Sequence, residues 1–232
     1  MTSRLHVGLL FWFEQVMATG GVDVFWSLEP LSYEEAVQLQ LNMASMVSEF
    51  DFLKEYRLFC GVDVAYSNQQ AVAAAVVQDQ DGNTLEAVKH RCAVRHAYVP
   101  GLLFLREAPP MIDAVRSLRG DFDVLLVDGN GRLHPRKFGI ACYIGIVLDK
   151  PTIGVAKKLL CGQIKTMHGR RVVVLYGDVV GEEVSKNVYV SVGHKISLNT
   201  AVEIVKKLTK GSRLPSPILA AHRLATEELK RT

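Results

Sequence analysis

Two short apolar runs constrain the fold of this chain more than any other feature of its sequence. Val124–Val127 is continuous and leads directly into Asp128, and Thr152–Ala156 leads directly into Lys157. Runs of this length without alternating polar residues are typical of strands that are buried on both faces of a parallel sheet. Residues 139–148 lie between them and have the composition of a buried helix. The sequence therefore predicts an α/β domain of three layers, with helices packed on a central sheet.

The segment before these runs has the pattern of an antiparallel meander. Apolar strands are expected over residues 58–66, 71–78 and 84–94. Asp81-Gly82 is a strong hairpin-turn signal between the last two strands. The expected sheet is therefore mixed, and it begins as this meander and continues with parallel strands.

Further elements follow from capping signals and periodicity. Ser32 and Glu35 form a capping-box pattern for a helix that extends to about residue 50. Another helix is expected over 102–118, and Pro109-Pro110 should break or restart it. Additional strands are expected over 172–180 and 187–192, and additional helices over 197–210 and 217–230.

Composition excludes several classes of protein. Hydrophobic residues make up 49% and charged residues 22%, a globular balance that argues against a disordered chain. The net charge of +3 permits nucleic-acid binding without requiring it, since a local basic patch matters more than the total. No apolar run approaches the ~20 residues that a membrane span needs. The cysteines form no CxxC pair, so we expect reduced, buried thiols and a location in the cytoplasm.

Residues 1–30 differ from the rest of the chain, because five aromatic residues crowd around Gly20-Gly21. The segment could be an element packed on the core, a partner-binding arm, or residues translated from an upstream start. Its apolar run, Val7–Phe13, faintly resembles the core of a signal peptide, but it is short and Glu14 follows it without a clear cleavage site. We expect an N-terminal extension of unknown role over 1–30 and a single domain over 31–232.

Three carboxylates lie where burial is costly. Asp63 is inside an apolar strand, Glu107 is on a mainly apolar helix, and Asp128 ends the first apolar run. An Arg side chain or a backbone N–H could satisfy each of them singly. Two neighbouring strands and a nearby helix could instead bring three oxygen ligands to one point, the set that Mg²⁺ prefers. Such an ion can activate water and stabilise charge on a phosphodiester that undergoes displacement.

Positively charged residues follow two of the predicted strands. The loop after Asp128 contains His134 and Arg136, although an ordinary basic surface loop has a similar composition. Its glycine spacing does not match the GxGxxG pattern of dinucleotide sites. Lys157 could neutralise a phosphate or position a nucleophilic water, or it could be a solvated residue at a strand end.

Tyr98 lies in a proline-bounded loop, two residues before Pro100-Gly101. An exposed aromatic side chain that is held stiffly on a turn can wedge between nucleic-acid bases. A loop tyrosine can equally well pack on its neighbours, so the position alone does not decide between the two.

Six motifs together resemble the endonuclease V family. They are Gly61-Val62-Asp63, Tyr98-Val99-Pro100-Gly101, Phe104-Leu105-Arg106-Glu107, Val127-Asp128-Gly129, His134-Pro135-Arg136 and Pro151–Lys157. The resemblance covers residues from about 33 to the end of the chain, and the stretches 127–136 and 151–157 are highly specific. It implies a ribonuclease H-like fold with a mixed central sheet, and a deoxyinosine 3′ endonuclease of DNA repair.

The resemblance also implies roles for the residues that match the motifs. The metal-binding catalytic acids would be Asp63, Glu107 and Asp128. Lys157 and His134 would lie at the scissile or a neighbouring phosphate. A further histidine near the active site would be His222, on the last helix.

A second group of matching residues would recognise the damaged base. Tyr98 would fill the gap left by an everted base. The residues that match the family's hypoxanthine pocket and its surroundings are Gly101, Leu103, Gly129, Gly139, Ile140 and Gly154.

The implied reaction is hydrolysis of the second phosphodiester bond 3′ to deoxyinosine, which leaves 3′-hydroxyl and 5′-phosphate ends. It would depend on Mg²⁺, with Mn²⁺ as a substitute. The expected protein is a monomer that binds inosine-containing DNA, with single-stranded DNA and RNA as further candidates, and no membrane. Three alternatives stay open: an inosine-specific endoribonuclease, a non-catalytic nucleic-acid-binding module on the same fold, and an actin-like phosphotransferase. The last would need a glycine-rich loop after the first strand, where the sequence has Tyr66-Ser67-Asn68.

Overall fold

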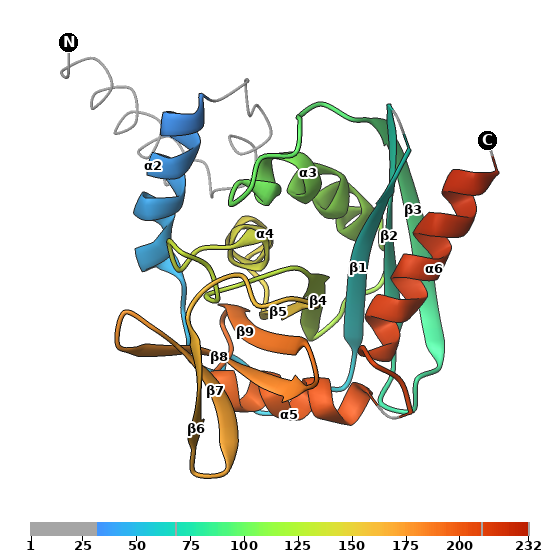
Figure 1. Cartoon of the computed structure of the whole chain (residues 1–232). Coiled ribbons are helices and arrows are strands. Elements are labelled where there is room, and N and C mark those ends of the chain that lie inside the picture. The colour runs from blue at the N-terminus through green and yellow to red at the C-terminus, as the bar shows by residue number, and fades with distance from the viewer. Residues whose placement is uncertain (1–31, 68, 210, 232) are drawn as a thin grey trace.

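The computed structural model of the chain describes residues 32–67, 69–209 and 211–231. The predicted extension over 1–30 lies outside these residues. In the described segments nine strands form one sheet in the order β3-β2-β1-β4-β5-β9-β8-β7-β6 (Figure 1). Their bounds are β1 Phe59–Tyr66, β2 Gln70–Gln78, β3 Thr84–Ala93, β4 Val124–Asp128, β5 Thr152–Ala156, β6 Gln163–Met167, β7 Arg170–Leu175, β8 Asp178–Ser185 and β9 Val188–His194.

The sheet is mixed, as the sequence predicts. Strands β1, β2 and β3 pair antiparallel as the expected meander. Strand β4 then pairs parallel with β1, and β5 pairs parallel with β4. Antiparallel strands β9, β8, β7 and β6 extend the sheet beyond β5. The ribonuclease H-like arrangement implied by the resemblance is therefore confirmed.

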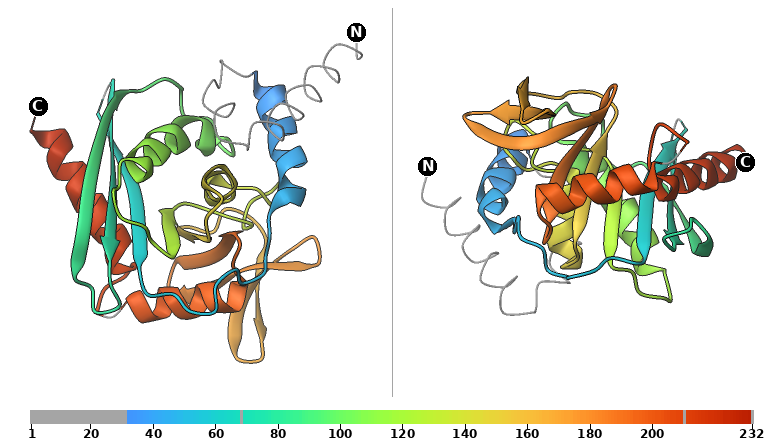
Figure 2. Two further views of the ribbon diagram at one scale, coloured as in Figure 1. Left: turned by 180° about the vertical axis from the view of Figure 1, so that it is seen from behind. Right: turned by 90° about the horizontal axis from the view of Figure 1, so that it is seen from below.

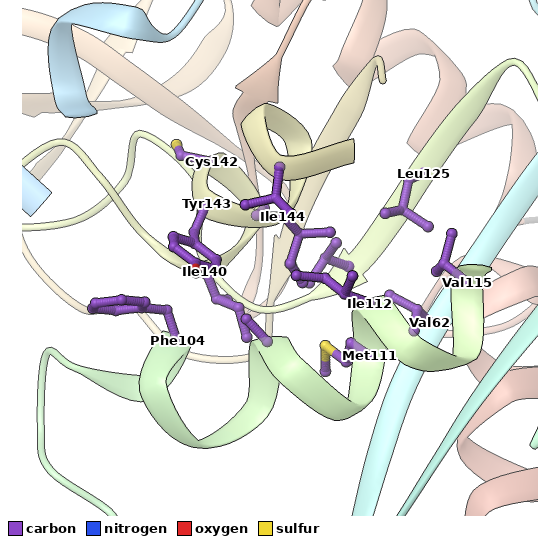
Figure 3. Packing of buried hydrophobic residues seen from close by; sticks show 14 of the residues in the cluster. Val62, Phe104, Met111, Ile112, Val115, Leu125, Ile140, Cys142, Tyr143 and Ile144 are labelled. Carbon is purple, nitrogen blue, oxygen red and sulfur yellow. The ribbon is translucent and has the colours of Figure 1, made fainter. Parts of the chain in front are cut away.

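Helices cover both faces of the sheet (Figures 1 and 2). Their bounds are α2 Tyr33–Met43, α3 Leu103–Arg116, α4 Ile140–Leu148, α5 Leu198–Leu208 and α6 Ser216–Lys230. Helices α3 and α4 pack on one face over a large apolar cluster, in which the rings of Phe104 and Tyr143 lie 5.0 Å apart (Figure 3). Helices α5 and α6 pack on the other face over further apolar clusters. The result is the three-layer plan expected from the two apolar runs.

Helix α3 runs through Pro109-Pro110 without the expected break. Two prolines remove two backbone N–H groups, which leaves the carbonyls of Leu105 and Arg106 without their helical partners. The Tyr66 hydroxyl donates a hydrogen bond to the Arg106 carbonyl at 3.3 Å. Because β1 supplies this donor, the freed carbonyl is satisfied and the helix continues.

Other differences from the sequence prediction concern element boundaries. The strand expected over 172–180 is divided by a turn at Tyr176-Gly177 into β7 and β8. Strand β6 was not predicted, because it is a polar and mostly exposed edge strand without an apolar pattern. The first helix ends at Met43 and continues only as a short 3₁₀ turn, Ala44–Met46, rather than extending to residue 50.

The interface between β1 and α6 depends on a glycine. A Cβ atom added to Gly61 would lie 2.2 Å from the backbone carbon of Pro217 and 2.5 Å from the backbone nitrogen of Ile218. Any side chain here would therefore collide with the first turn of α6 rather than with a movable side chain. Gly61 allows the helix to lie directly on the strand that carries Asp63.

The cysteines are all free thiols, as expected. Cys60 and Cys142 are buried, whereas Cys92 and Cys161 are partly exposed, which corrects the expectation that all four are buried. Within the described residues, no helix is both long enough and apolar enough to cross a membrane.

Candidate active site

Adjacent parallel strands bring two of the predicted acids together. The register of β1 and β4 pairs Val62 with Val127, so Asp63 and Asp128 are the next residues along neighbouring strands. Both side chains point to the face opposite Val62 and Val127, because successive strand residues alternate between faces. Val62 and Val127 belong to the cluster under α3 and α4, so the two acids face the side of the sheet that carries α6.

Glu107 on α3 joins the two aspartates electrostatically. Burial raises the pKa of Glu107 to about 7, and the negative charges of Asp63 and Asp128 add to the rise. Burial, followed by the charge of Asp128, also raises the pKa of Asp63, although a hydrogen bond from His222 opposes the change. The three carboxylates therefore share one region in which their charges repel one another.

Two other predicted residues pair with the aspartates. His222 Nδ1 lies 2.6 Å from Oδ2 of the buried Asp63. Lys157, just beyond the end of β5, donates a hydrogen bond to Asp128 through its ammonium group. Four of the six predicted catalytic side chains are thus in direct contact as two pairs, and Glu107 on α3 is close enough to both aspartates for their charges to affect it.

The donor set fits a hard divalent cation in its chemistry, since it offers carboxylate oxygens whose mutual repulsion a cation would relieve. Across the described residues, no group of three or more His, Cys, Asp or Glu side chains is arranged so that it could hold a metal ion as it stands. The Lys157 ammonium and the His222 ring occupy carboxylate oxygens instead. Both contacts are made to Oδ2, so they leave Oδ1 of each aspartate for a cation. Metal binding by the three acids stays a prediction.

Glu107→Gln is expected to stabilise the protein above pH 7 when divalent cations are chelated. A carboxyl group whose pKa is raised on folding contributes stability below its unfolded pKa of 4.5, and that stability is lost as the pH rises toward about 7. Glutamine stays neutral at every pH. The free energy of unfolding of the variant should therefore exceed that of the wild type by on the order of 2 kcal/mol at pH 8, and should equal it near pH 4.5. Thermal melting between pH 4.5 and pH 8 measures the difference.

The exposed Glu203 on α5 provides the matched control. Glu203→Gln should leave the melting profile of the wild type unchanged. Parallel melting profiles for Glu107→Gln and the wild type across this pH range would contradict the charge repulsion inferred for the site.

The Tyr98 loop is a tight turn whose tip is fixed by backbone geometry. The Leu102 N–H donates to the Val99 carbonyl at 3.0 Å, and Gly101 has a φ of +80°. Proline followed by glycine in this conformation is typical of a type II β-turn. Tyr98 comes directly before the turn, and it is 63% exposed. The predicted wedge residue is therefore an exposed aromatic beside a rigid turn.

His134 lies under this turn and is only 4% exposed. Its Nδ1 accepts a hydrogen bond from the Arg136 N–H at 3.2 Å, so its proton is on Nε2, which donates to the Gly101 carbonyl at 3.1 Å. Burial, aided by the charge of Arg136, lowers the pKa of His134 to about 4. The ring is thus neutral and engaged by protein groups. This geometry gives it an anchoring role, and the expected phosphate contact stays a prediction.

Most of the predicted pocket residues are packed against one another. A Cβ atom on Gly129 would lie 2.5 Å from Cγ2 of Ile140, and one on Gly154 would lie 2.4 Å from the Gly131 nitrogen. A Cβ atom on Gly139 would lie 2.1 Å from the Asn130 carbonyl oxygen. Residues 129, 139, 140 and 154 are buried, whereas Gly101 and Leu103 are partly exposed. The small residues bring the loop after β4, the start of α4 and β5 into close contact.

Gln40 is a residue at this site that the sequence analysis missed. It is 1% exposed and accepts a hydrogen bond at Oε1 from Arg136 Nε at 2.6 Å. A signal was available, because Ala36, Leu39 and Met43 form the apolar stripe of the helix and Gln40 interrupts it at helical spacing. A polar residue on such a stripe indicates a buried hydrogen-bond partner.

Comparisons with known proteins show which family the chain belongs to. Residues 41–223 match the Endonuclease V family model. Endonuclease V of Thermofilum pendens is 50% identical over 207 residues, which cover 85% of this chain and 89% of that protein. Endonuclease V of Desulfurococcus amylolyticus is 41% identical over 200 residues, which cover 80% of this chain and 90% of that protein.

Solved structures show the same similarity. Endonuclease V from Streptomyces avermitilis has a TM-score of 0.78 at 31% identity and covers 90% of this chain and 97% of its own. Ciona intestinalis endonuclease V has a TM-score of 0.76 at 27% identity, and the match covers 84% of this chain and 96% of that chain. That structure is a complex with a 24mer DNA containing an inosine followed by a ribo-adenosine. With the family model matching most of its length and a relative sharing half of its aligned residues, this chain belongs to the endonuclease V family of nucleases.

Proposed function

We propose that this chain is a Mg²⁺-dependent endonuclease that recognises deoxyinosine in DNA and hydrolyses the second phosphodiester bond 3′ to it. The products would carry 3′-hydroxyl and 5′-phosphate ends. The observation that supports this proposal best is the gathering of Asp63, Glu107 and Asp128 with Lys157 and His222. We further propose that the enzyme acts as a monomer in the cytoplasm, with one domain over 31–232.

Each side chain would have a distinct part in the reaction. The carboxylates of Asp63, Glu107 and Asp128 would hold the cation, which when bound supplies water activation and stabilisation of charge on the phosphate. His222 orients the Asp63 carboxylate through its hydrogen bond. Lys157, whose side chain is 40% exposed, can turn from Asp128 toward a phosphate and neutralise its charge.

Recognition would rest on eversion of the base. Inosine pairs weakly, so removing it from the stack costs less free energy than removing a normal base. Hypoxanthine lacks the 2-amino group of guanine, so a tight pocket of backbone groups can reject guanine by steric overlap. The pocket expected around Gly101, Leu103, Gly129 and Ile140 would be separate from the cation held by the acids, so the cut would fall beside the lesion rather than at it.

Cleavage of an end-labelled duplex that contains one inosine tests the proposal. We expect one cut at the second bond 3′ to inosine in Mg²⁺ or Mn²⁺, and no cut with a chelator or with adenine in place of inosine. A cut at another position, or cleavage that survives chelation, would refute the proposal. Tight binding without any cleavage would favour the non-catalytic binding module.

A second candidate is an endoribonuclease that acts at inosine in RNA. It is favoured by the substrate in the Ciona intestinalis complex, where a ribo-adenosine follows the inosine. A panel of matched DNA, RNA and mixed strands, each with inosine at the same position, separates the two candidates. Faster cleavage of the RNA members at equal enzyme concentration would replace the DNA proposal with this one.

Tyr98→Ala is expected to weaken selection of inosine more than it weakens general DNA binding. An aromatic side chain that stacks on bases contributes ~1–3 kcal/mol, so the preference for inosine should fall roughly tenfold. Competition between inosine-containing and unmodified duplexes measures that preference. Tyr33→Ala is the matched control, because Tyr33 is also exposed but lies on α2. An unchanged preference in Tyr98→Ala would remove the wedge role.

A further inference from the structure

A buried glutamine on α2 is linked by hydrogen bonds to the turn that follows Tyr98. Gln40 Nε2 donates to the Phe138 carbonyl at 2.8 Å, and Gln40 Oε1 accepts from Arg136 Nε at 2.6 Å. Both ends of the amide are therefore used, and Gln40 is 1% exposed. Helix α2 lies beside α4, at the end of the molecule away from α6 (Figures 1 and 2).

Arg136 carries the connection from Gln40 to the turn. Its Nη2 donates to the Gly101 carbonyl at 2.7 Å, and the same oxygen accepts from His134 Nε2 at 3.1 Å. A Cβ atom on residue 101 would lie 2.9 Å from Arg136 Nη2, and the φ of +80° at this position also favours glycine. The carbonyl at the tip of the turn thus receives two donors from the loop after β4.

The hydrogen bond to Gln40 sets the direction in which Arg136 approaches the Gly101 carbonyl. Arg136 is only partly buried, and its side chain has many alternative rotamers in solvent. A guanidinium presents its N–H groups in one rigid plane, so fixing Nε and Nη2 fixes the orientation of the whole group. Gln40 Oε1 fixes the position of Arg136 Nε, and the Gly101 carbonyl fixes the position of Nη2.

We propose that Gln40 is a positioning residue for the Tyr98 loop, acting through Arg136 on the Gly101 carbonyl. By holding the loop, Gln40 would also affect the selection of inosine, and this effect rests on the proposed function, in which Tyr98 enters the DNA. The effect of Gln40 on the position of the turn does not depend on that function. Helix α2 supplies this acceptor from outside the sheet, while its own docking depends on Ala36, Leu39 and Met43 in the apolar core.

Hydrogen exchange of the free protein tests the positioning directly. In Gln40→Met the Leu102 amide, which bonds to the Val99 carbonyl, should exchange roughly tenfold faster, because Arg136 loses a hydrogen-bond partner. Amides of β4 should keep the protection of the wild type, which shows that the core is intact. Gln38→Met is the matched control, since Gln38 is on the same helix but exposed.

Gln40→Glu tests whether the acceptor itself is what matters. Glutamate keeps an oxygen for Arg136 Nε but loses the donor to Phe138, so protection of the Leu102 amide should be restored. Equal exchange at Leu102 in Gln40→Met and wild type would overturn the proposal. Loss of protection in Gln40→Glu as large as in Gln40→Met would also overturn it, because the effect would then come from the packing of α2.

Competition binding tests the consequence for inosine selection. Gln40→Met should lower the preference for inosine by up to tenfold, and adding Tyr98→Ala should lower it no further, because both changes act through one loop. Additive losses would overturn the link between Gln40 and Tyr98. If Tyr98→Ala alone had no effect, the wedge role in the proposed function would fail, while the exchange of Leu102 would still decide the positioning.

Discussion

Asp128→Asn is expected to reduce cleavage of inosine-containing DNA by at least about 10³-fold in Mg²⁺, a loss of ~4 kcal/mol of transition-state stabilisation. Asp128 lies at the end of β4, beside Asp63, and its carboxylate pairs with Lys157. Asparagine keeps the size of the side chain but removes the charge that a divalent cation requires. Binding should persist, because removing a negative charge from the site lowers repulsion toward DNA.

Single-turnover cleavage and binding to the same duplex separate the two effects. Asp81→Asn is the matched control, because Asp81 is an exposed aspartate in the turn between β2 and β3. The control should cleave like the wild type. Activity of Asp128→Asn above a tenth of the wild-type rate would rule out Asp128 as a ligand of the catalytic cation.

Gly61→Ala is expected to cost about 3 kcal/mol of folding free energy and to lower the melting temperature by ~5–10 °C. The added methyl group would lie 2.2 Å from the backbone of Pro217, so α6 has to move away from β1. Because α6 carries His222, the same movement should lengthen its hydrogen bond with Asp63 and reduce cleavage. Thermal melting and a cleavage assay performed below the melting transition measure the two effects.

Gly120→Ala controls for the general effect of replacing glycine. A Cβ atom at Gly120 would meet only Glu86 Oε2, the end of a flexible side chain, at 3.3 Å. The change in stability should therefore stay within ~0.5 kcal/mol. If the melting temperature of Gly61→Ala lay within ~2 °C of the wild-type value, the change in stability would be under about 1 kcal/mol. That result would contradict the direct contact between β1 and α6.

The sequence predicts the strands that form the base of the site better than the rest of the fold. The bounds of β4 and β5 agree with the two apolar runs, because burial on both faces leaves a continuous apolar pattern that stops at a charged residue. Strand β6 lacks that pattern, since its side chains are mostly exposed. The continuity of α3 was equally hidden, because it depends on the Tyr66 hydroxyl from another element.

In the candidate site, too, features of the local sequence could be predicted, whereas contacts between residues far apart along the chain could not. The three acids stand out in the sequence, because Asp63 and Glu107 lie within apolar segments and Asp128 ends one. The burial of His134 is not recognisable, since it depends on the Gly101 carbonyl, which is 33 residues away along the chain. Pairings of this kind are determined by the topology of the sheet, which no local pattern specifies.

The contact between α6 and β1 also has a consequence for the timing of activity during translation. Asp63 and His222 are 159 residues apart, so nearly the whole domain must leave the ribosome before they can meet. Contacts that span so much of the chain form slowly, because the entropy of closing a long loop opposes them. A nascent chain that still lacks α6 therefore holds Asp63 without its His222 partner, so under the proposed function we expect it not to cleave nucleic acid until α6 has emerged and docked.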